Sequence, residues 1–534
     1  MNSTSAQAAQ GVTQVESGRK SVVRSCLFLT ILAVLLAGRA FWYDFLSDDA
    51  LIVARYARNI VRGHGWVYNV GERVEGYTSF VWVAVAARLA KFGVDYVRAV
   101  QSMSLASALL TLPLLLACAK PLEIKSQTGV RWIAPLLFAC CSTVAVWAWG
   151  GLEATGYAFL TLLTLYLLTA GQLTVRRAAA AGVVAGLCGL TRPEGAAVAA
   201  VISFWLGVDA ARGKWRVIGA YALPAIVLIG AHLLWRKQYY GYWLPNTAYA
   251  KVGSGSSVWA QGFLYLRGCL QEKGGMLAWL LPIAAPWFTY RNAFARGLSL
   301  TATAMMCGIV LVGGDGLPMH RFLMPIVPLW LLLFARLLGV MVEWGRSAMT
   351  AARTATRGTA IVAVLIVAFS LATNTDSSDH YIRYWYQQLR EIPDWTAVGQ
   401  WLNKVSSDGD SVACAPIGAI GYYSNLTVYD MMGLTDTHIA HKDMPLGTGW
   451  AGHEKHDGPY ILSRKPTYLL LGNVQVLDKP LATNSPYFVR PPNDAIRARE
   501  SDIFTQELAE NYTPRVAPLE NGKFLHLLQR RPGK

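Results

Sequence analysis

The stretch Phe41-Trp-Tyr-Asp-Phe-Leu-Ser-Asp-Asp-Ala50 decides how this chain folds, because two acidic residues follow directly on an apolar segment. That segment, Ser25–Tyr43, is long enough to span or nearly span a bilayer. Basic residues precede it and no small-residue cleavage motif follows, so it is typical of an uncleaved start-transfer helix. Acids without partners at a membrane boundary usually mark chemistry. Asp48 and Asp49 are therefore the first candidate site.

The composition places the chain in a membrane. Of 534 residues, 54% are hydrophobic and only 15% are charged, and the mean hydropathy is positive. An ordinary soluble domain is smaller and carries more charge. We predict a mainly α-helical, multi-pass protein of the inner or plasma membrane.

Twelve apolar runs are candidate spans, but Phe80–Phe92 is too short and carries Arg88 and Lys91. It is expected to lie flat in the interface, as a second amphipathic helix after the basic segment Leu51–Arg62. The remaining eleven predicted spans are Ser25–Tyr43, Ala99–Ala119, Trp132–Trp149, Gly156–Ala170, Ala178–Leu190, Gly195–Val208, Val217–Trp235, Met276–Phe288, Leu298–Val312, Phe322–Val342 and Ala360–Ala372.

The distribution of charge predicts the orientation. With eleven spans, sixteen basic and four acidic residues fall on the side of the N-terminus, a net charge of +12 out of the total of +16. Basic loops face the cytosol, so the charge is an orientation signal and nucleic acid is not expected as a partner. If Phe80–Phe92 crossed the membrane, these clusters would lie outside.

This topology divides the chain into three parts. We predict a cytosolic tail over 1–24, a transmembrane domain over 25–372 with an external loop at 44–98, and an extracytoplasmic (periplasmic) soluble α/β domain over 373–534. In the last part, short apolar runs such as Ser411–Ala415 and Thr467–Leu471 are typical of strands. Its first segment is rich in Tyr and Trp, which suits a contact with the membrane interface.

The unusual polar motifs all fall on the predicted external side, where we expect a shared cavity. Arg, Lys and His beside carboxylates are suited to holding a phosphate. The candidate substrate-binding residues are His64, Glu75, Tyr77, Glu153, Arg192, Glu194, Asn246, Lys251, Asp315, His320 and Arg321.

Each candidate also has a structural interpretation. Asp48 or Asp49 is expected to cap the helix over Leu51–Arg62, but a cap needs only one acid, which leaves the other as a general base. Arg192 either pairs with Glu194, as buried charges must, or holds a lipid phosphate. Juxtamembrane cations such as Lys251 and Arg321 alternatively reach toward lipid headgroups.

A phosphate site beside an acid on the external face favours sugar transfer from a polyprenyl-phosphate carrier. The acid would activate the incoming hydroxyl and the cations would stabilise the departing phosphate. No nucleotide-binding or metalloprotease motif occurs in a suitable context, and a cytosolic nucleotide-sugar cannot reach an external site. We therefore expect no cofactor besides the lipid-linked donor substrate.

Four histidines in the predicted soluble domain have a spacing that also suits zinc: His438, His441, His453 and His456. Solvated loop histidines that contact an acceptor glycan are the favoured interpretation, with Asp436, Asp443 and Asp457 as partners. The prediction is that the chain holds no metal.

Several motifs together resemble a known class. They are the acid pair at Asp48 and Asp49, GHGWVYNVGERVEGYTS at 63–79, LTRPEG at 190–195, PNTAYAK at 245–251, GGDGLPMHRFLMP at 313–325 and YDMMGLTD at 429–436. From about Asp44 to Tyr460, the chain resembles the GT-C class of integral-membrane glycosyltransferases, in particular the group that includes the mycobacterial terminal arabinofuranosyltransferase.

The resemblance implies a donor such as decaprenyl-phosphoryl arabinofuranose and an acceptor that is an envelope glycan or a surface protein. It also implies a catalytic aspartate after the first helix, which corresponds to Asp48 or Asp49, and juxtamembrane helices in the first external loop.

Two other functions compete with an enzyme. A transporter or flippase for a lipid-linked sugar usually places its binding groups near mid-membrane within inverted repeats, whereas here the motifs gather at one face and no repeat is visible. The second alternative is a noncatalytic envelope assembly factor. This function would not explain why the basic residues of the polar motifs lie on one predicted side of the membrane.

Overall fold

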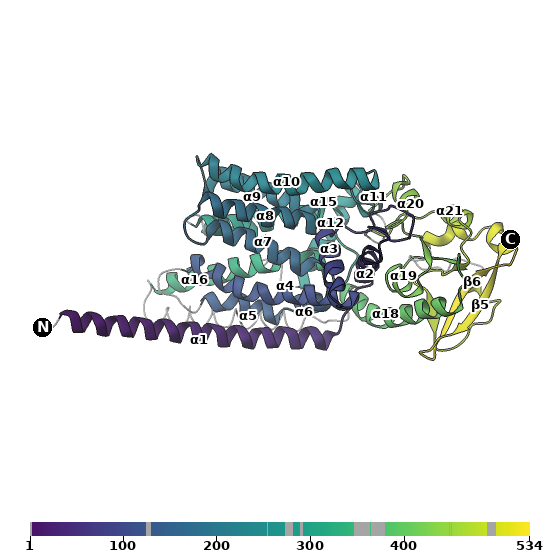
Figure 1. Cartoon of the computed structure of the whole chain (residues 1–534), viewed down its shortest axis with the longest axis horizontal. Coiled ribbons are helices and arrows are strands. Elements are labelled where there is room, and N and C mark those ends of the chain that lie inside the picture. Colours follow the sequence, from purple (N-terminus) through teal and green to yellow (C-terminus); the bar gives the residue numbers. More distant parts are fainter. Residues whose placement is uncertain are drawn as a thin grey trace.

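The structure is a computed structural model that describes residues 3–123, 130–253, 255–272, 281–288, 292–346, 364, 380–447, 449, 451–488 and 498–533. A bundle of long helices forms one half of the molecule, and an α/β domain forms the other (Figure 1). We call this second part, from His380 onward, the tail domain. The first helix, α1 (Ser3–Tyr43), runs along one edge of the bundle toward the tail domain.

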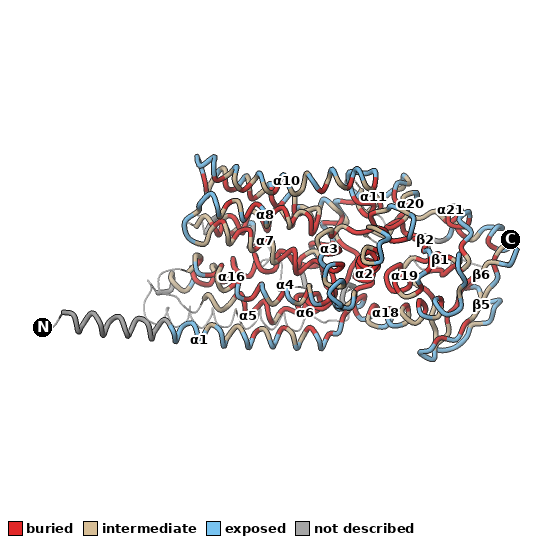
Figure 2. The backbone as a smooth tube through the Cα atoms, in the orientation of Figure 1, coloured by how far each residue is buried: buried red, intermediate tan, exposed pale blue. Residues whose placement is uncertain are grey.

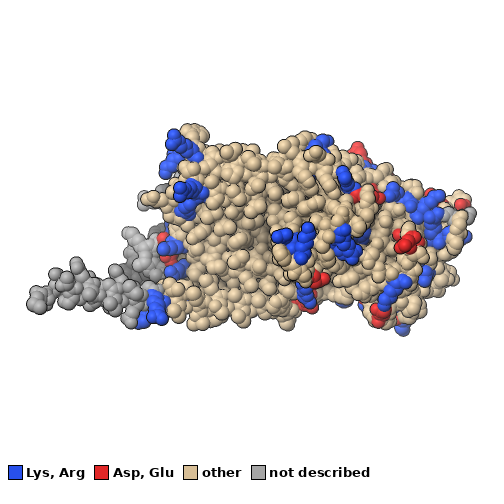
Figure 3. Space-filling view, in the orientation of Figure 1, with Lys and Arg blue, Asp and Glu red and all other residues tan. Residues whose placement is uncertain are grey.

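The bundle contains the helices that the apolar runs predict. Its main members are α4 (Tyr96–Ala119), α7 (Ala154–Thr169), α8 (Val175–Thr191), α9 (Glu194–Trp205), α10 (Trp215–Tyr240), α14 (Leu281–Phe288), α15 (Ala293–Leu311) and α16 (Val327–Arg346). On the face that Figure 3 shows, the middle of the bundle carries almost no charged side chains, between basic residues at its far end and mixed charges on the tail domain. An uncharged belt is what a lipid-facing surface requires.

The number of crossings stays a prediction. By length and composition, four described helices are suited to crossing a membrane, or five if one bent pair counts as a span. Apart from Val364, the predicted span Ala360–Ala372 lies outside the described residues, as does the start of Met276–Phe288.

The bent pair lies at one predicted span. Trp132–Trp149 is not a single helix but α5 (Ile133–Cys140) and α6 (Ser142–Trp149), at an angle of 58°. Cys141 between them has an extended backbone, with ψ at 122°. The Ser142 hydroxyl is bonded to Arg39 and Tyr43 of α1, at 3.0 Å each, which fixes the start of α6.

Two further differences lie near the tail domain. The helix expected from Phe322 begins only at Val327, because residues Arg321–Leu323 form a 3-10 turn. A helix that the apolar pattern did not predict, α12 (Ser256–Glu272), packs on α15, with Gly262 against the backbone of Val310.

The two helices predicted for residues 44–98 are present as α2 (Asp48–Val61) and α3 (Phe80–Lys91). The position of α2 differs from the expected one on the lipid surface, because nearly every residue from Asp48 to Asn59 is buried. Its basic side chains bond to the tail domain instead of lipid headgroups. Arg55 donates to the Leu426 carbonyl at 2.7 Å, and Arg58 donates to the Tyr422 carbonyl at 2.7 Å.

The tail domain is built on a mixed sheet of short strands in the order β2-β1-β3-β6-β4, with β5 also pairing with β6. β1 (Ser411–Cys414) is parallel to β2 (Thr427–Asp430) and β3 (Tyr468–Leu469), while β6 (Phe524–Arg530) is antiparallel to β3, β4 (Gln475–Leu477) and β5 (Tyr512–Pro518). Shorter helices pack around it: α19 (Gly418–Ser424), α20 (Thr437–His441), α21 (Gly458–Ser463) and α22 (Gln506–Asn511).

The tail domain and the bundle form one continuous buried region, which Figure 2 shows passing from α2 into α19. Several aromatic residues of α18 (His380–Val405) belong to this buried region. Tyr384, Trp385 and Trp395 are buried, and Trp385 packs edge-on against Tyr43 of α1 with ring centroids 5.2 Å apart. Of the aromatic residues expected at the interface, Tyr386 is exposed.

Candidate active site

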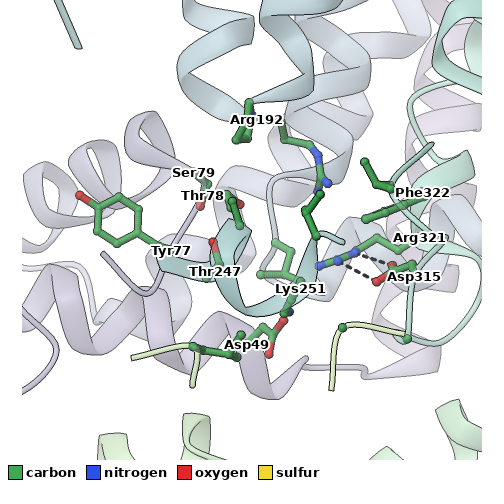
Figure 4. A pocket seen from close by; sticks show the side chains of 18 of the residues that line it. Asp49, Tyr77, Thr78, Ser79, Arg192, Thr247, Lys251, Asp315, Arg321 and Phe322 are labelled. Carbon is green, nitrogen blue, oxygen red and sulfur yellow. Dashed lines mark hydrogen bonds and ion pairs between the residues drawn. The ribbon is translucent and has the colours of Figure 1, made fainter. Parts of the chain in front are cut away.

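A cavity of about 230 Å³ opens where the bundle meets the tail domain, and residues from the predicted polar motifs line it (Figure 4). The sequence-predicted residues in its wall are Asp49, Tyr77, Glu153, Arg192, Glu194, Lys251, Asp315 and Arg321. The membrane side supplies most of this wall, and the tail domain supplies Leu434, Ala451, Gly452 and His453. The convergence of these motifs in one cavity agrees with the expectation from the sequence.

The two neighbouring acids have different environments. The Asp48 carboxylate accepts hydrogen bonds from the backbone N–H groups of Gly418 and Ala419, at 2.8 and 2.7 Å. It therefore caps α19 of the tail domain, not its own helix as expected. Burial raises the pKa of Asp48 to about 7, against the opposing effect of these two donors.

Asp49 lies one residue further along α2 and faces the cavity. It is half-buried, and no group among the described residues donates a hydrogen bond to its carboxylate or forms an ion pair with it. A carboxylate with free lone pairs in a cavity is suited to accepting a proton from a bound hydroxyl. The geometry thus separates a structural acid, Asp48, from one available to a ligand, Asp49.

Arg192 is held between two carboxylates. It lies in extended backbone between α8 and α9, and its guanidinium bonds to Glu153 and Glu194, each at 2.8 Å. These bonds fix the guanidinium at the cavity wall and compensate its charge. The second oxygen of Glu194, Oε2, is buried without a partner among the described residues. Arg192 therefore forms the ion pair with Glu194 that the sequence allowed, and it forms a second one with Glu153.

Arg321 has a similar support. Its guanidinium forms a two-point pair with Asp315, at 2.9 and 3.0 Å. The Phe322 ring lies between the two arginines, with its centroid 4.8 Å from the guanidinium carbon of Arg192 and 5.2 Å from that of Arg321. Cation–π contacts with the same ring thus hold two like charges in one wall.

Lys251 is the cation without a compensating acid. It ends the short helix α11 (Asn246–Lys251), and no described residue pairs with its ammonium group. Thr247 on the same helix is buried at the cavity wall with its hydroxyl unpartnered among the described residues. The wall thus presents three cations and four carboxylates, and Lys251 is the cation most available to an anion.

Besides Asp48, four of the sequence-predicted residues lie outside this wall. His64 is exposed, and Glu75 is buried in a pair with Arg236 at 2.6 Å. Asn246 donates to the carbonyls of Gly433 and Leu434, at 2.8 and 3.1 Å, and so anchors the tail domain. His320 is fully buried beside Cys269, with 3.0 Å between Nδ1 and Sγ.

The four histidines of the tail domain do not converge. His438 pairs with Asp457 at 3.0 Å, His456 pairs with Asp502 at 3.1 Å, and His441 stacks on Tyr249 at 4.1 Å. His453 alone lines the cavity. Within the described ranges, no three His, Cys, Asp or Glu side chains form a group suited to a metal ion.

A smaller cavity of about 80 Å³ adjoins the first and shares Arg192, Arg321 and Phe322 with it. Its other walls are apolar side chains of α9 and α15, such as Val198, Val201, Met305 and Ile309. The charged cavity therefore continues into an apolar one between two helices of the bundle.

Sequence reasoning missed three groups of the main cavity: the hydroxyl of Thr247, the ring of Phe322 and the backbone around Leu434. Both Thr247 and Phe322 stand inside quoted motifs, directly beside residues that were selected. Neither carries a charge, so nothing distinguishes them in an apolar chain.

Comparison with known proteins agrees with this architecture. The chain is 28% identical over 356 residues to the terminal β-(1→2)-arabinofuranosyltransferase of Corynebacterium glutamicum, covering 56% of this chain and 50% of that protein. It is 32% identical over 267 residues to the protein of the same name from Mycobacterium tuberculosis, covering 46% of this chain and 41% of that protein. The chain thus spans about half the length of these curated relatives or less.

The archaeal oligosaccharyltransferase AglB from Archaeoglobus fulgidus, solved with an inhibitory peptide and a dolichol-phosphate, has a similar structure. It aligns with a TM-score of 0.52 at 12% identity, covering 94% of this chain and 74% of that one. The chain has a GT-C fold. As a GT-C protein it resembles the mycobacterial arabinofuranosyltransferase group, and its residues 380–517 match a family described only as a domain of unknown function, DUF8728.

Proposed function

We propose that this GT-C protein transfers a sugar from a polyprenyl-phosphate donor to an acceptor hydroxyl on the external side of the membrane. One observation carries the proposal. An unpartnered carboxylate, Asp49, shares a cavity with the cations Arg192, Arg321 and Lys251, and this cavity continues into an apolar one between membrane helices. Such a combination matches a ligand with an anionic head and a hydrocarbon chain.

The donor would lie across the two cavities. Its first prenyl units would occupy the apolar cavity along Val198 and Met305, and its phosphate would lie near Arg192, Arg321 and Lys251. Both arginines are already paired with acids, so they would contribute their remaining N–H donors. Lys251 would contribute the uncompensated charge.

The reaction would be a displacement at the anomeric carbon. The acceptor oxygen forms a bond to that carbon, its proton passes to the Asp49 carboxylate, and the bond from carbon to the phosphate oxygen breaks. The electron pair of that bond leaves with the polyprenyl phosphate, where the cations stabilise the developing charge. No redox step or additional co-reactant is required.

The finer assignment is arabinofuranose as the sugar and an envelope glycan or surface protein as the acceptor. The names of the two curated relatives support the sugar. In this assignment the protein is a multi-pass inner or plasma membrane protein with a cytosolic N-terminus and an extracytoplasmic tail domain.

The test is a donor panel. Purified full-length chain in detergent or nanodiscs is incubated with radiolabelled decaprenyl-phosphate sugars, including arabinofuranose, and with a synthetic arabinofuranosyl octyl glycoside as acceptor. We expect label to move to the glycoside from the arabinofuranose donor. Transbilayer movement of donor in liposomes without transfer would instead identify a flippase and overturn the proposal.

A further inference from the structure

The turn from α3 into α4 brings exposed cations and exposed apolar side chains together. We call residues 88–98 the α3–α4 corner. Arg88 and Lys91 end α3, Arg98 lies in the first turn of α4, and all three are exposed. Between them, Phe92 is 70% exposed and Val94 is 37% exposed. The proposed reaction uses none of these residues.

Two helices that are suited to crossing a membrane place this corner at a membrane boundary. The corner leads directly into α4, which is one of them. The end of α1, the other, reaches the same level, because Phe41 packs edge-on against Trp149 and the guanidinium carbon of Arg98 lies 5.7 Å from that ring. Phe41 and Trp42 are exposed, and aromatic residues at such a level are typical of the headgroup region.

The three cations of the corner form no ion pair with a described acid. The guanidinium carbon of Arg88 lies 4.7 Å from the centroid of the Phe92 ring, a cation–π contact that requires no N–H donor. Arg98 donates to Gln101 Oε1 at 3.3 Å. Since a guanidinium has five N–H donors, both arginines keep donors for a ligand.

Asp95 is the one acid in the sequence of the corner, and it caps a helix. Its Oδ1 accepts from the backbone N–H groups of Val97 and Arg98, at 3.0 Å each, at the start of α4. Three cations and one acid give the corner a net charge of +2. Lys and Arg are depleted on the external side of membrane proteins, so a charge of this sign on the predicted external side suggests an anionic ligand.

The neighbouring helix α2 shows what its own cations do. Arg55 and Arg58 point to the tail domain and donate to main-chain carbonyls there. The cations of α3 have no such partner among the described residues, although α3 packs beside α2. Figure 3 shows basic side chains gathered where α3 lies, between the uncharged middle of the bundle and the tail domain.

We propose that the α3–α4 corner binds the headgroups of net-negative phospholipids in the leaflet nearest the tail domain. The cations contact the headgroup phosphate, and Phe92 and Val94 enter the boundary between headgroups and acyl chains. A zwitterionic headgroup brings its own ammonium group, whereas a net-negative headgroup leaves the phosphate charge to the three cations. This inference goes beyond the proposed function and does not depend on the proposed reaction.

The apolar side chains favour a lipid over other anions. A free phosphate ion would contact the cations and leave Phe92 and Val94 in water. An acidic protein would have to bind where α4 enters the bilayer, at the level of the lipid headgroups. A phospholipid satisfies both the charged and the apolar side chains.

The experiment measures hydrogen exchange of the corner in nanodiscs. The purified full-length chain is placed in phosphatidylcholine alone or in a mixture with one third phosphatidylglycerol. We expect slower exchange of the corner in the mixture. Native mass spectrometry then compares the affinity for the two lipids, and Arg88→Gln/Lys91→Gln/Arg98→Gln should lower the preference for phosphatidylglycerol about ten- to a hundredfold.

Two matched variants accompany it. Arg88→Lys/Arg98→Lys keeps every charge, so it should keep the preference for phosphatidylglycerol. The second, on the tail domain, removes three charges from exposed residues and should also keep the preference: Lys465→Gln/Lys479→Gln/Arg531→Gln. Because all these side chains are exposed, the thermal unfolding midpoints in phosphatidylcholine should match that of the wild type.

A salt titration of the wild type tests the corner without any substitution. The slower exchange of the corner in phosphatidylglycerol should disappear as salt screens the headgroups. Persistence of the lipid preference in the triple Gln variant of the corner, or its equal loss in the tail variant, would overturn the inference. So would inorganic phosphate that slows exchange in phosphatidylcholine as much as phosphatidylglycerol does. No donor or acceptor sugar is present, so failure of the proposed reaction leaves these results unchanged.

Discussion

The residues on the membrane side and on the tail side of Asp49 differ in charge. On the membrane side, charged side chains hold one another: Arg192 with Glu153 and Glu194, and Arg321 with Asp315. On the tail side, a third cavity of about 50 Å³ shares Asp49 with the first. Apart from Asp48, Asp49 and His453, its wall is formed by neutral side chains such as Gln388, Tyr384 and Trp395. The difference teaches that charge is concentrated on the side where the phosphate of the proposed donor would lie.

The largest effect should come from the residue between the two sides. Asp49→Asn keeps the shape of the side chain but removes the proton acceptor, so transfer should fall by about 10²- to 10⁴-fold. The binding of undecaprenyl phosphate, measured in parallel, should change little.

Asp44→Asn is the matched control, since Asp44 is exposed, lies outside the cavity wall and has a φ of 42° that asparagine tolerates. If Asp48→Asn abolished transfer and Asp49→Asn did not, the base would be assigned to the wrong acid.

The next largest effect is expected on the membrane side of Asp49, where the charged pairs lie. Removing one partner of a buried ion pair leaves the other uncompensated, so the useful variant is the double change Arg321→Gln with Asp315→Asn. It should weaken binding of undecaprenyl phosphate about ten- to a hundredfold, because the forked donor is lost. Calorimetry with the lipid in detergent measures this.

The control is Arg296→Gln with Asp209→Asn, which removes another Arg–Asp pair, more exposed and with a 2.6 Å contact, that lies outside all three cavities. Equal losses of lipid affinity in both double variants would mean that the Arg321 pair acts through stability alone.

Lys251→Gln should have a smaller effect, about tenfold on lipid affinity, because a long flexible side chain offers a single charge. Its signature is the salt dependence of binding, which should become shallower than in the wild type. Lys237→Gln is the control, since Lys237 bonds the Gly241 carbonyl and does not line the cavity. An unchanged affinity and salt dependence for Lys251→Gln would remove Lys251 from the phosphate site.

The smallest effect on transfer, less than tenfold, is expected for Asp48→Asn. This change tests the hydrogen bonds that the backbone of α19 donates to Asp48. The folded-state pKa of Asp48, about 7, lies above the ordinary value of 3.8. The contribution of Asp48 to the free energy of unfolding is therefore complete below about pH 4. It is lost as the pH rises through about 7, and the free energy of unfolding falls by about 1 kcal/mol per pH unit over this range.

Unfolding midpoints measured from pH 5 to pH 8 should fall more for the wild type than for Asp48→Asn. Parallel curves for the two proteins would contradict the assignment of this pH dependence to Asp48.

Much of the membrane side was predictable from the sequence, because charged residues in an apolar chain must gather and find partners. Arg192, Lys251 and Arg321 were selected on that basis and line one cavity. His64 and His320 satisfied the same criterion but lie outside its wall. The presence of a polar residue in an apolar chain shows that its side chain needs a hydrogen-bond or ion-pair partner. It does not show which residue or ligand that partner is.

The tail side was much less predictable. Asp48 and Asp49 are adjacent, and neighbouring residues on a helix point about 100° apart, so only the position of α19 separates the cap from the candidate base. Gln388 lies on a helix whose aromatic residues suggested a membrane contact. Its buried Oε1 atom has no hydrogen-bond partner among the described residues, and a sequence does not record missing partners.

The docking of the tail domain on α2 has a consequence for divergence among related proteins. Arg55, Arg58, Asn69 and Asp48 bond to main-chain atoms of the tail domain, so these bonds are available whatever side chains the tail carries. Steric demands fall on Gly418 and Gly421, where a Cβ would meet Asp48 and the Tyr68 hydroxyl. Such an attachment allows a tail to drift in sequence, or to be exchanged between paralogues, while the membrane module stays fixed.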